Sequence, residues 1–458
     1  MSEQSGALRA RRHGAPAKLP PQAQTQAAGS RSAAPVTVRL RPRPGRLGPL
    51  RLPQLVLVEL AAALVLIGLA TNRVVLTVDG VVAVLLVLLA LLRWNGLSFT
   101  EHAGVRAALQ ARRRRAAANP VDPQADPLLV PVLECDPALR IVQHTVEAEG
   151  KGAAGRRERR EIGMVGDGTF LTAVLQVEAP DEPLRPEHNA RSLPLELLGA
   201  GLVVDDIVLD AIQVVQYAQP APAPHLPEQA LAARGYRELP GSQRTPGLRL
   251  TWVTVRLDPE LCLTAVAARG GGDIGARKSL QRAADQLAAR LAGAGLPTTV
   301  LDAAAVASAV STAVCANPLA AGSAGNGSRN GRRTAETTRA WRCDDRWHTT
   351  YWVGQWPRLS PSGGTAAARG AVTAPDLVNL LTGGTALGTT FSLTVRQAEG
   401  GAVALTGQVR VTARGDQELE QAARQLEARA KSVGATLVRL DREQVPGVLA
   451  TLPLGGTR

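Results

Sequence analysis

Two long apolar runs near the N-terminus dominate the pattern of hydrophobic and polar positions along the chain. Residues 52–70 and 74–92 span 19 positions each, and Glu59 and Asp79 are their only charged members. As helices they would be about 28 Å long, just enough to cross a hydrocarbon core of roughly 30 Å. Only residues 71–73 separate them, so the pattern predicts a transmembrane helical hairpin. Two buried core helices are the alternative, which the basic flanks disfavour.

The net charge of +13 is confined to one end of the 458-residue chain. Residues 1–115 contain 17 Lys and Arg against four acids, whereas residues 116–458 contain 35 basic and 35 acidic side chains. A domain that binds nucleic acid is expected to be basic itself. The charge therefore indicates a membrane segment, and we expect no nucleic-acid partner.

Basic residues flank both outer ends of the hairpin, and its turn contains only Arg73. By the positive-inside rule, both termini are predicted to be cytoplasmic in a two-helix inner-membrane protein. The basic clusters also suit anionic lipid headgroups. The candidates for headgroup contact are Arg46, Arg51, Arg93, Arg112, Arg113, Arg114 and Arg115.

The two intramembrane acids have open interpretations. Glu59 lies near the inner end of the first run and Asp79 near the outer end of the second, so they are poorly placed to pair. Intramembrane acids usually face protein or water. Glu59 is therefore predicted to face another subunit's helix or a polar cavity. The alternative for both residues is that each reaches toward its nearer interface.

Composition divides the rest of the chain. Residues 1–38 are predicted to be a disordered basic tail, and residues 93–131 a basic stalk and proline-rich linker. Two α+β halves, 133–318 and 341–458, are separated by a Gly/Ser-rich linker over residues 319–340.

An internal repeat supports the two halves. Residues 283–302 align without gaps to 422–441, with nine of twenty positions identical. Each block is an amphipathic helix closed by a glycine (Gly295, Gly434), then a strand, then an Asp in a helix N-cap position (Asp302, Asp441). Strands, helices and strands precede each block in the same order. The first half is predicted at 169–178, 192–199, 207–217 and 248–257, and the second at 349–356, 374–381, 389–395 and 403–411. The fold class is therefore α+β: the two-helix transmembrane hairpin is followed by a duplicated β-α-β-β-α-β (split β-α-β, ferredoxin-like) cytoplasmic region.

Catalytic patterns are weak. Four cysteines are too few for a disulfide scaffold, and Cys343 with His348 has no second pair of ligands, so we expect no metal and no cofactor. The glycine-rich loop from Arg269 to Gly272 precedes a helix, but it lacks the Lys-Ser/Thr of a phosphate loop. A membrane-tethered transferase or nucleotide-binding enzyme using this loop is the alternative to a non-enzymatic protein.

The segment WRCDDRWHTTYWVGQW is a candidate partner interface because Trp, Tyr and Arg dominate interface energetics. The alternative is that its aromatic residues fill the core of a strand. The interface candidates are Trp341, Arg342, Arg346, Trp347, Tyr351, Trp352 and Trp356.

Several segments, in order from Arg39 to the C-terminus, resemble EccE, the membrane component of actinobacterial type VII (ESX) secretion systems. They include RLRPRPGRLGPLRLPQLVLVELA, GMVGDGTFLTAVLQVEA, LTWVTVRLDPELC, RAWRCDDRWHTTYWVGQWP and LVRLDREQVPGVLATLPLGG. The resemblance implies a non-enzymatic subunit that stabilises an inner-membrane complex containing EccB, EccC and EccD. It implies no catalytic residues, and the energy would come from the EccC ATPase.

Overall fold

The computed structural model describes residues 38–40, 46–47, 50–91, 93–94, 97–122, 124–151, 157–178, 192–222, 229–231, 234–235, 247–317, 319–320, 332–360, 371–398 and 402–456. The chain divides into two units, Met1–Val36 and Thr37–Arg458. All described residues belong to the second unit. The tail predicted over residues 1–38 therefore lies almost wholly outside them.

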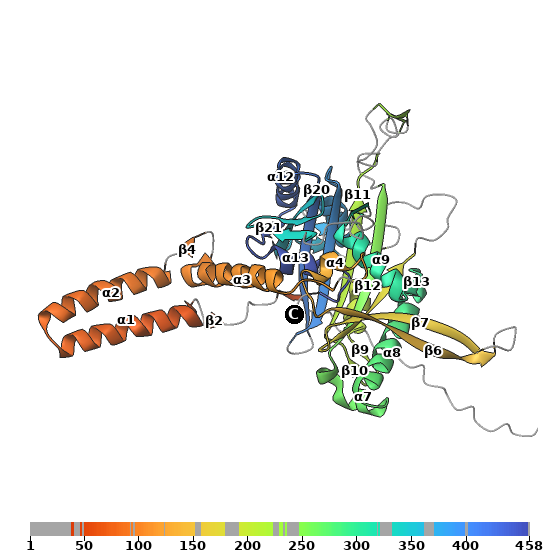
Figure 1. Cartoon of the computed structure of the whole chain (residues 1–458), viewed down its shortest axis with the longest axis horizontal. Helices are drawn as coiled ribbons and strands as arrows, with labels where there is room; N and C mark the ends of the chain where they lie inside the picture. Colours follow the sequence, from red (N-terminus) through yellow and green to blue (C-terminus); the bar gives the residue numbers. More distant parts are fainter. Residues whose placement is uncertain are drawn as a thin grey trace, which may run out of the picture. The chain divides into compact units, whose positions relative to one another are not determined.

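Helices and strands follow one another along the second unit (Figure 1). The helices are α1 (Leu52–Ala70), α2 (Arg73–Leu91), α3 (Phe99–Ala118), α4 (Val130–Leu133), α5 (Leu195–Ala200), the 3-10 helix η2 (Pro259–Cys262), α7 (Leu263–Ala268), α8 (Gly272–Gly293), α9 (Ala303–Val314), α11 (Ala374–Thr382), α12 (Asp416–Ser432) and α13 (Gln444–Ala450). The strands are β1 (Val38–Leu40), β2 (Arg46–Leu47), β3 (Leu50–Arg51), β4 (Arg93–Trp94), β5 (Leu97–Ser98), β6 (Arg140–Lys151), β7 (Arg157–Gly166), β8 (Leu171–Val177), β9 (Val203–Val204), β10 (Ile207–Val208), β11 (Ala211–Gln219), β12 (Leu248–Leu257), β13 (Thr298–Val300), β14 (Thr334–Glu336), β15 (Trp341–Cys343), β16 (Arg346–Gln355), β17 (Leu359–Ser360), β18 (Val372–Thr373), β19 (Gly388–Gln397), β20 (Val403–Ala413) and β21 (Thr436–Arg439).

The two apolar runs form the helices α1 and α2, which pack side by side (Figure 1). The side chain of Asn72 accepts a hydrogen bond from the N–H of Val75 at 3.0 Å, so it caps the start of α2. Small residues line the contact between the helices. Ala61 and Ala83 are buried, and a side chain at Gly68 would meet the backbone of Leu76.

A membrane-spanning role for these helices finds no support in the described residues. None of the helices searched there is both long enough and apolar enough to cross a membrane.

The predicted α+β class is confirmed. Thirteen of the described strands form one sheet, in the order β14-β15-β16-β20-β19-β11-β12-β8-β7-β6. Three strands lie off this path: β13 pairs with β8, β21 pairs with β16, and β1 pairs with β20. All of these pairings are antiparallel except that of β1 with β20.

The two halves place equivalent elements in equivalent positions. In the first, β8, α5, β11, β12, α8 and β13 follow one another along the chain, and the sheet order is β13-β8-β12-β11. In the second, β16, α11, β19, β20, α12 and β21 follow one another, with the sheet order β21-β16-β20-β19. The halves meet where β11 pairs with β19, from Ile212 opposite Val395 to Ala218 opposite Thr389.

Each face of the sheet carries its own core, since neighbouring residues of a strand point to opposite faces. Ala173 and Leu175 of β8 belong to the core under α5, α7, α8, α11 and α12. Val174, between them, belongs to the core under α4, α9 and α13. The C-terminal residues 451–456 are buried on this second face.

The two repeated blocks have the predicted glycines at their helix ends, but only the first block has the predicted aspartate N-cap. Gly295 and Gly434 both have positive φ, +80° and +78°, as expected for glycines that close a helix. The side chain of Asp302 accepts the N–H of Ala305 and caps α9. Asp441 does not cap α13, because its carboxylate instead accepts from Arg439 at 2.8 Å, and Glu443 occupies the N-cap position.

Candidate functional site

The tryptophan-rich segment divides between the core and the surface. Trp341 is only 1 % exposed and Tyr351 is fully buried, so the predicted interface role of these two residues is wrong. Trp341 lies against the His348 ring, with the ring centroids 5.0 Å apart. The hydroxyl of Tyr351 donates to Glu427 at 2.8 Å, and burial raises the pKa of this tyrosine. Both residues fill the protein interior, as the alternative interpretation of the segment expects.

The remaining members of the segment reach the surface. Trp347, Trp352 and Trp356 are half-buried, and Arg342 is exposed. Arg346 pairs with Asp345, with 3.2 Å between Nε and Oδ1. In a strand, residues on opposite faces alternate, so Trp347 and Trp352 of β16 point to different faces of the sheet. The predicted interface is therefore not one continuous tryptophan surface.

The two acids of the α1–α2 hairpin differ in their surroundings. Glu59 is exposed on α1, whereas Asp79 is half-buried on α2. A side chain at Gly68 would lie 3.3 Å from Cβ of Asp79, so Asp79 faces the first helix at a point where that helix has no side chain.

The basic cluster at the end of α3 makes contacts within the chain. Arg112 binds the Glu336 carboxylate through two nitrogens, each at 3.0 Å, and Glu336 is only 5 % exposed. Arg113 donates to the backbone oxygen of Glu336 at 2.8 Å and 3.1 Å. These contacts turn both guanidinium groups toward β14 instead of leaving them free for lipid headgroups. Arg114 and Arg115 are exposed.

Three further headgroup candidates have no described side chains. The side chains of Arg46, Arg51 and Arg93 lie outside the described residues.

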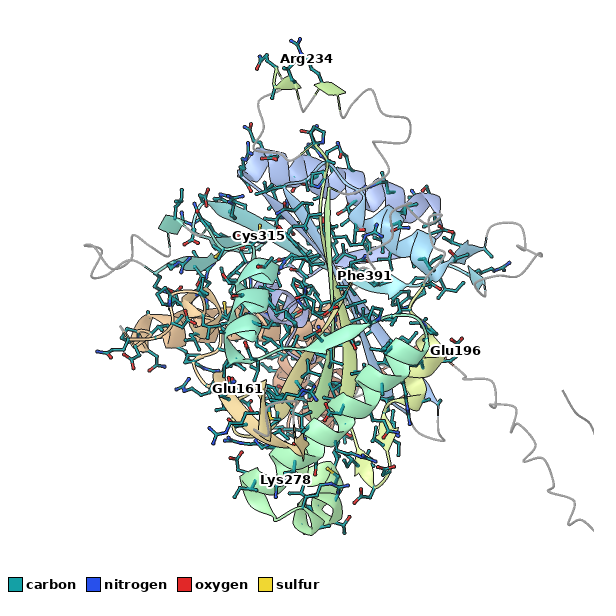
Figure 2. All side chains as sticks on the ribbon, turned by 90° about the vertical axis from the view of Figure 1, so that its right-hand side faces the viewer. Glu161, Glu196, Arg234, Lys278, Cys315 and Phe391 are labelled. Carbon is teal, nitrogen blue, oxygen red and sulfur yellow. The ribbon has the colours of Figure 1, made fainter. Side chains whose placement is uncertain are left out.

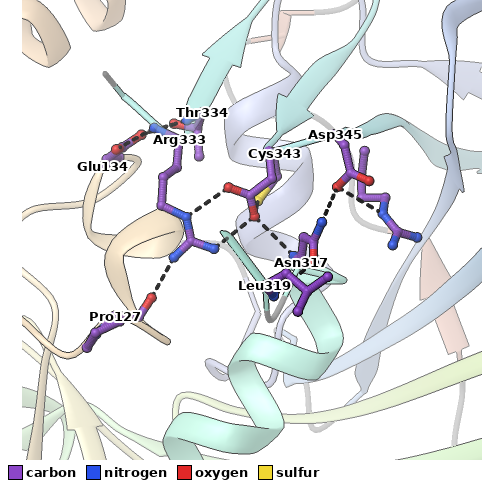
Figure 3. A network of polar contacts seen from close by, with 10 residues as sticks. Pro127, Glu134, Asn317, Leu319, Arg333, Thr334, Cys343 and Asp345 are labelled. Carbon is purple, nitrogen blue, oxygen red and sulfur yellow. Dashed lines mark hydrogen bonds and ion pairs between the residues drawn. The ribbon is translucent and has the colours of Figure 1, made fainter. Parts of the chain in front are cut away.

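Near Glu336, the partner of Arg112, a buried polar network joins the two halves (Figure 3). The Asp344 carboxylate accepts two hydrogen bonds from Arg333, both at 2.8 Å, and one from the N–H of Asn317 at 3.0 Å. The side chains of Arg333 and Asp344 are 9 % and 5 % exposed. Glu134, just after α4, accepts from the N–H groups of Arg333 and Thr334 at 2.9 Å and 2.8 Å. The start of the first half is thus hydrogen-bonded to residues 333–334 at the start of β14, the strand that precedes the second half.

Sequence reasoning missed this network. Glu134, Arg333 and Asp344 lie in segments without periodicity, and β14 lies inside the region predicted as a linker, 319–340. Asp344 has a φ of +53°, a conformation that Asp and Asn adopt more readily than most residues, but this angle is visible only in the structure.

The glycine-rich loop from Arg269 to Gly272 connects α7 to α8. Its arginine binds both carboxylate oxygens of Asp206, at 2.9 Å and 2.7 Å, and also donates to the backbone oxygen of Ala265. The Arg269 hydrogen bonds hold the pKa of Asp206 below its usual range. An anion at this loop would compete with Asp206 for the guanidinium, which disfavours the nucleotide-binding alternative.

The residues that the structure describes contain no cluster of metal ligands. Among the described residues, no group of three or more His, Cys, Asp and Glu side chains could hold a metal ion. Cys343 is buried, and burial is the main cause that raises the pKa of its thiol far above the usual value.

His348 and Arg410 form a buried basic pair. Both are fully buried, and Nδ1 of His348 contacts the Thr412 hydroxyl at 2.9 Å. Burial lowers the pKa of His348 well below its ordinary value, and the nearby guanidinium groups of Arg410 and Arg346 lower it further. Burial lowers the pKa of Arg410 to about 10.

Acid destabilisation follows from the lowered pKa of His348. The unfolded chain protonates this histidine near pH 6.5, whereas the folded chain does so only at lower pH. The stability that neutral His348 contributes is therefore complete above about pH 6.5 and is lost as the pH falls. The expected slope is up to about 1.4 kcal/mol per pH unit in the free energy of unfolding. Urea unfolding of the full chain between pH 5 and 8 measures it. The His348→Asn variant should lose this slope, and parallel pH curves for the two proteins would contradict the assignment.

Comparison with protein-family models gives one match. The family described as "Putative type VII ESX secretion system translocon, EccE" matches residues 245–353. This range runs from before β12 into β16 and includes Arg333, Asp344 and the first tryptophans of the candidate interface. No curated protein matches the chain. The match agrees with the resemblance of the sequence segments: residues 245–353 are similar to the EccE family.

Proposed function

We propose that the protein is a non-enzymatic, membrane-anchored structural subunit of a type VII protein secretion complex. The EccE family match over residues 245–353 is the observation that carries this proposal, because the family is described as a translocon component of that system. The partners would be the other membrane subunits of the complex, of the EccB, EccC and EccD types. The chain would stabilise their assembly through its helical hairpin and its α+β region.

The α1–α2 hairpin would be the membrane anchor. Each helix has 19 residues, which is about 28 Å of length. Large apolar side chains are exposed around both helices, and a patch of this kind is costly in water. They include Val56, Leu60, Leu66, Ile67, Leu69, Val74, Val78, Val81, Val84, Leu85 and Leu88. With the basic flanks inside, both termini would be cytoplasmic, and Arg114 and Arg115 would contact anionic headgroups.

The α+β region would be a duplication of a split β-α-β, ferredoxin-like unit. Two observations support this: the matching strand orders β13-β8-β12-β11 and β21-β16-β20-β19, and the matching positive-φ glycines Gly295 and Gly434. Such a region offers surfaces rather than a catalytic site. Trp347, Trp352 and Trp356 with Arg342 and Arg346 would contribute to partner contacts, and Glu59 would face a helix of another subunit.

Lysines placed on the hairpin test the membrane anchor. Val81 and Leu85 are 64 % and 55 % exposed and lie one turn apart on α2. We expect the Val81→Lys, Leu85→Lys double variant to move from the carbonate-resistant membrane fraction to the supernatant, since each lysine near a helix centre costs about 2.5–3.5 kcal/mol.

Leu231→Lys is the matched control, because Leu231 is 85 % exposed outside the hairpin. This variant should stay in the membrane fraction. If the double variant also stays there, the hairpin is not the anchor. If the parent chain is membrane-bound but does not co-purify with other secretion subunits, the proposed function itself is wrong.

A further inference from the structure

The two edge strands of the large sheet, β14 and β6, differ in whether their outward backbone groups have partners. At one end, the outward groups of β14 are occupied. The N–H of Thr334 donates to the Glu134 carboxylate at 2.8 Å, and the backbone oxygen of Glu336 accepts from Arg113. At the other end lies β6, and among the described strands only β7 pairs with it.

The register identifies which groups of β6 face outward. Gln143 lies opposite Gly163 of β7, and the N–H of Gly163 donates to the backbone oxygen of Leu301 at 2.8 Å, away from β6. In an antiparallel pair, opposed residues either bond to each other or both point away. Gln143 therefore points its N–H and C=O to the open side, and by alternation so do Ile141 and Thr145.

This edge is rigidly placed. The side chain of Gln143 accepts the N–H of Ala303 at the start of α9 at 2.8 Å. The ring of His144 contacts Gln281 of α8 at 3.3 Å, and Arg160 of β7 pairs with Asp285 of the same helix at 2.6 Å. Figure 2 shows the β-hairpin formed by β6 and β7, marked by Glu161, beside α8, marked by Lys278. A strand held on both faces is already in the conformation that pairing needs.

The middle of this edge lacks the usual protection against pairing. Exposed edge strands are commonly guarded by proline or by charged side chains. Residues 141–146 read IVQHTV, with neither, and the charged residues of β6 (Arg140, Glu147, Glu149 and Lys151) lie before and after them. Six backbone groups from Ile141, Gln143 and Thr145 are thus presented to the outside in alternating positions, and only an extended segment matches that spacing.

We propose that the open edge of β6 binds an extended segment of another protein by strand addition. This inference rests on the proposed function, in which the chain is one subunit of a larger assembly. A second copy of this chain fits less well. Self-pairing about a two-fold axis through Gln143 would place Arg140 opposite Val146 and Glu147 opposite the buried Leu139, so no charge would meet its opposite.

Hydrogen exchange of the backbone amides tests the proposal without altering the protein. The full chain is measured alone in detergent and again within the detergent-solubilised secretion complex, with exchange resolved for residues 139–147. We expect the amides of Ile141, Gln143 and Thr145 to exchange at least about tenfold more slowly in the complex, as new hydrogen bonds would cause. Equal exchange in both samples would overturn the proposal.

A matched pair of variants adds a second readout. Thr145 is exposed, so Thr145→Pro removes one outward N–H from an edge position that tolerates proline. Thr145→Val keeps that N–H. The proline variant should lose the protection of Ile141 and Gln143 in the complex, and the valine variant should retain it.

Two other outcomes separate the possible failures. Protection that appears in the isolated chain and grows with its concentration would mean self-pairing, which overturns the assignment to another protein. A chain that co-purifies with the complex but has an unprotected edge refutes strand addition alone. A chain that does not co-purify refutes the proposed function, and this inference falls with it.

Discussion

We expect the Asp344→Asn variant to lower the free energy of unfolding of the full chain by about 3–5 kcal/mol, the range for losing one partner of a buried ion pair. Asparagine keeps the size of the side chain and tolerates the positive φ of this position. The negative charge and one of the two acceptor oxygens are lost, and Arg333, 9 % exposed, is left without its counter-charge. Urea unfolding followed by tryptophan fluorescence measures the effect.

The neighbouring residue supplies the control. Asp345 also pairs with an arginine, Arg346, but its side chain is 57 % exposed. Asp345→Asn should therefore cost no more than about 1 kcal/mol. Similar losses for the two variants would mean that the Arg333–Asp344 pair does not hold the second half in place.

The second large effect separates core tryptophans from surface tryptophans. Trp341→Ala should lower the free energy of unfolding by about 3–5 kcal/mol, because this side chain is 1 % exposed and its removal leaves a large cavity. The Trp347→Ala, Trp352→Ala double variant removes half-buried side chains instead. It should unfold closer to the parent protein but co-purify less with the secretion subunits proposed as its partners.

Two results would contradict this division. If the double variant unfolds as easily as Trp341→Ala, its loss of partners reports misfolding and not a surface contact. If it folds and co-purifies like the parent, Trp347 and Trp352 lie outside the partner interface.

Strand and helix positions followed well from local patterns. The predicted strand 248–257 coincides with β12, and the predicted helix 374–381 differs from α11 by one residue. The β6–β7 hairpin was missed because β7 begins RERRE, where charged residues hide the alternation of the strand. β14 and β15 were missed because they are only three residues long.

Burial was harder to predict within the aromatic segment. Composition does not distinguish Trp341 from Trp352, which are buried and half-buried respectively. Their difference depends on which strands and helices cover each position. Trp341 of β15 packs in the core with Val445 and Val448 of α13, which come about a hundred residues later in the chain.

Features that depend on near neighbours could be predicted from the sequence. These are the two apolar helices, the order of elements in each half, and the glycines that close α8 and α12, because periodicity and backbone preference act over a few residues. Contacts between distant segments became visible only in the folded chain. Arg112 and Glu336 are 224 residues apart, so a charge expected to face lipid instead pairs with β14. The open edge of β6 has the same origin, since sheet order is set by pairing between distant strands.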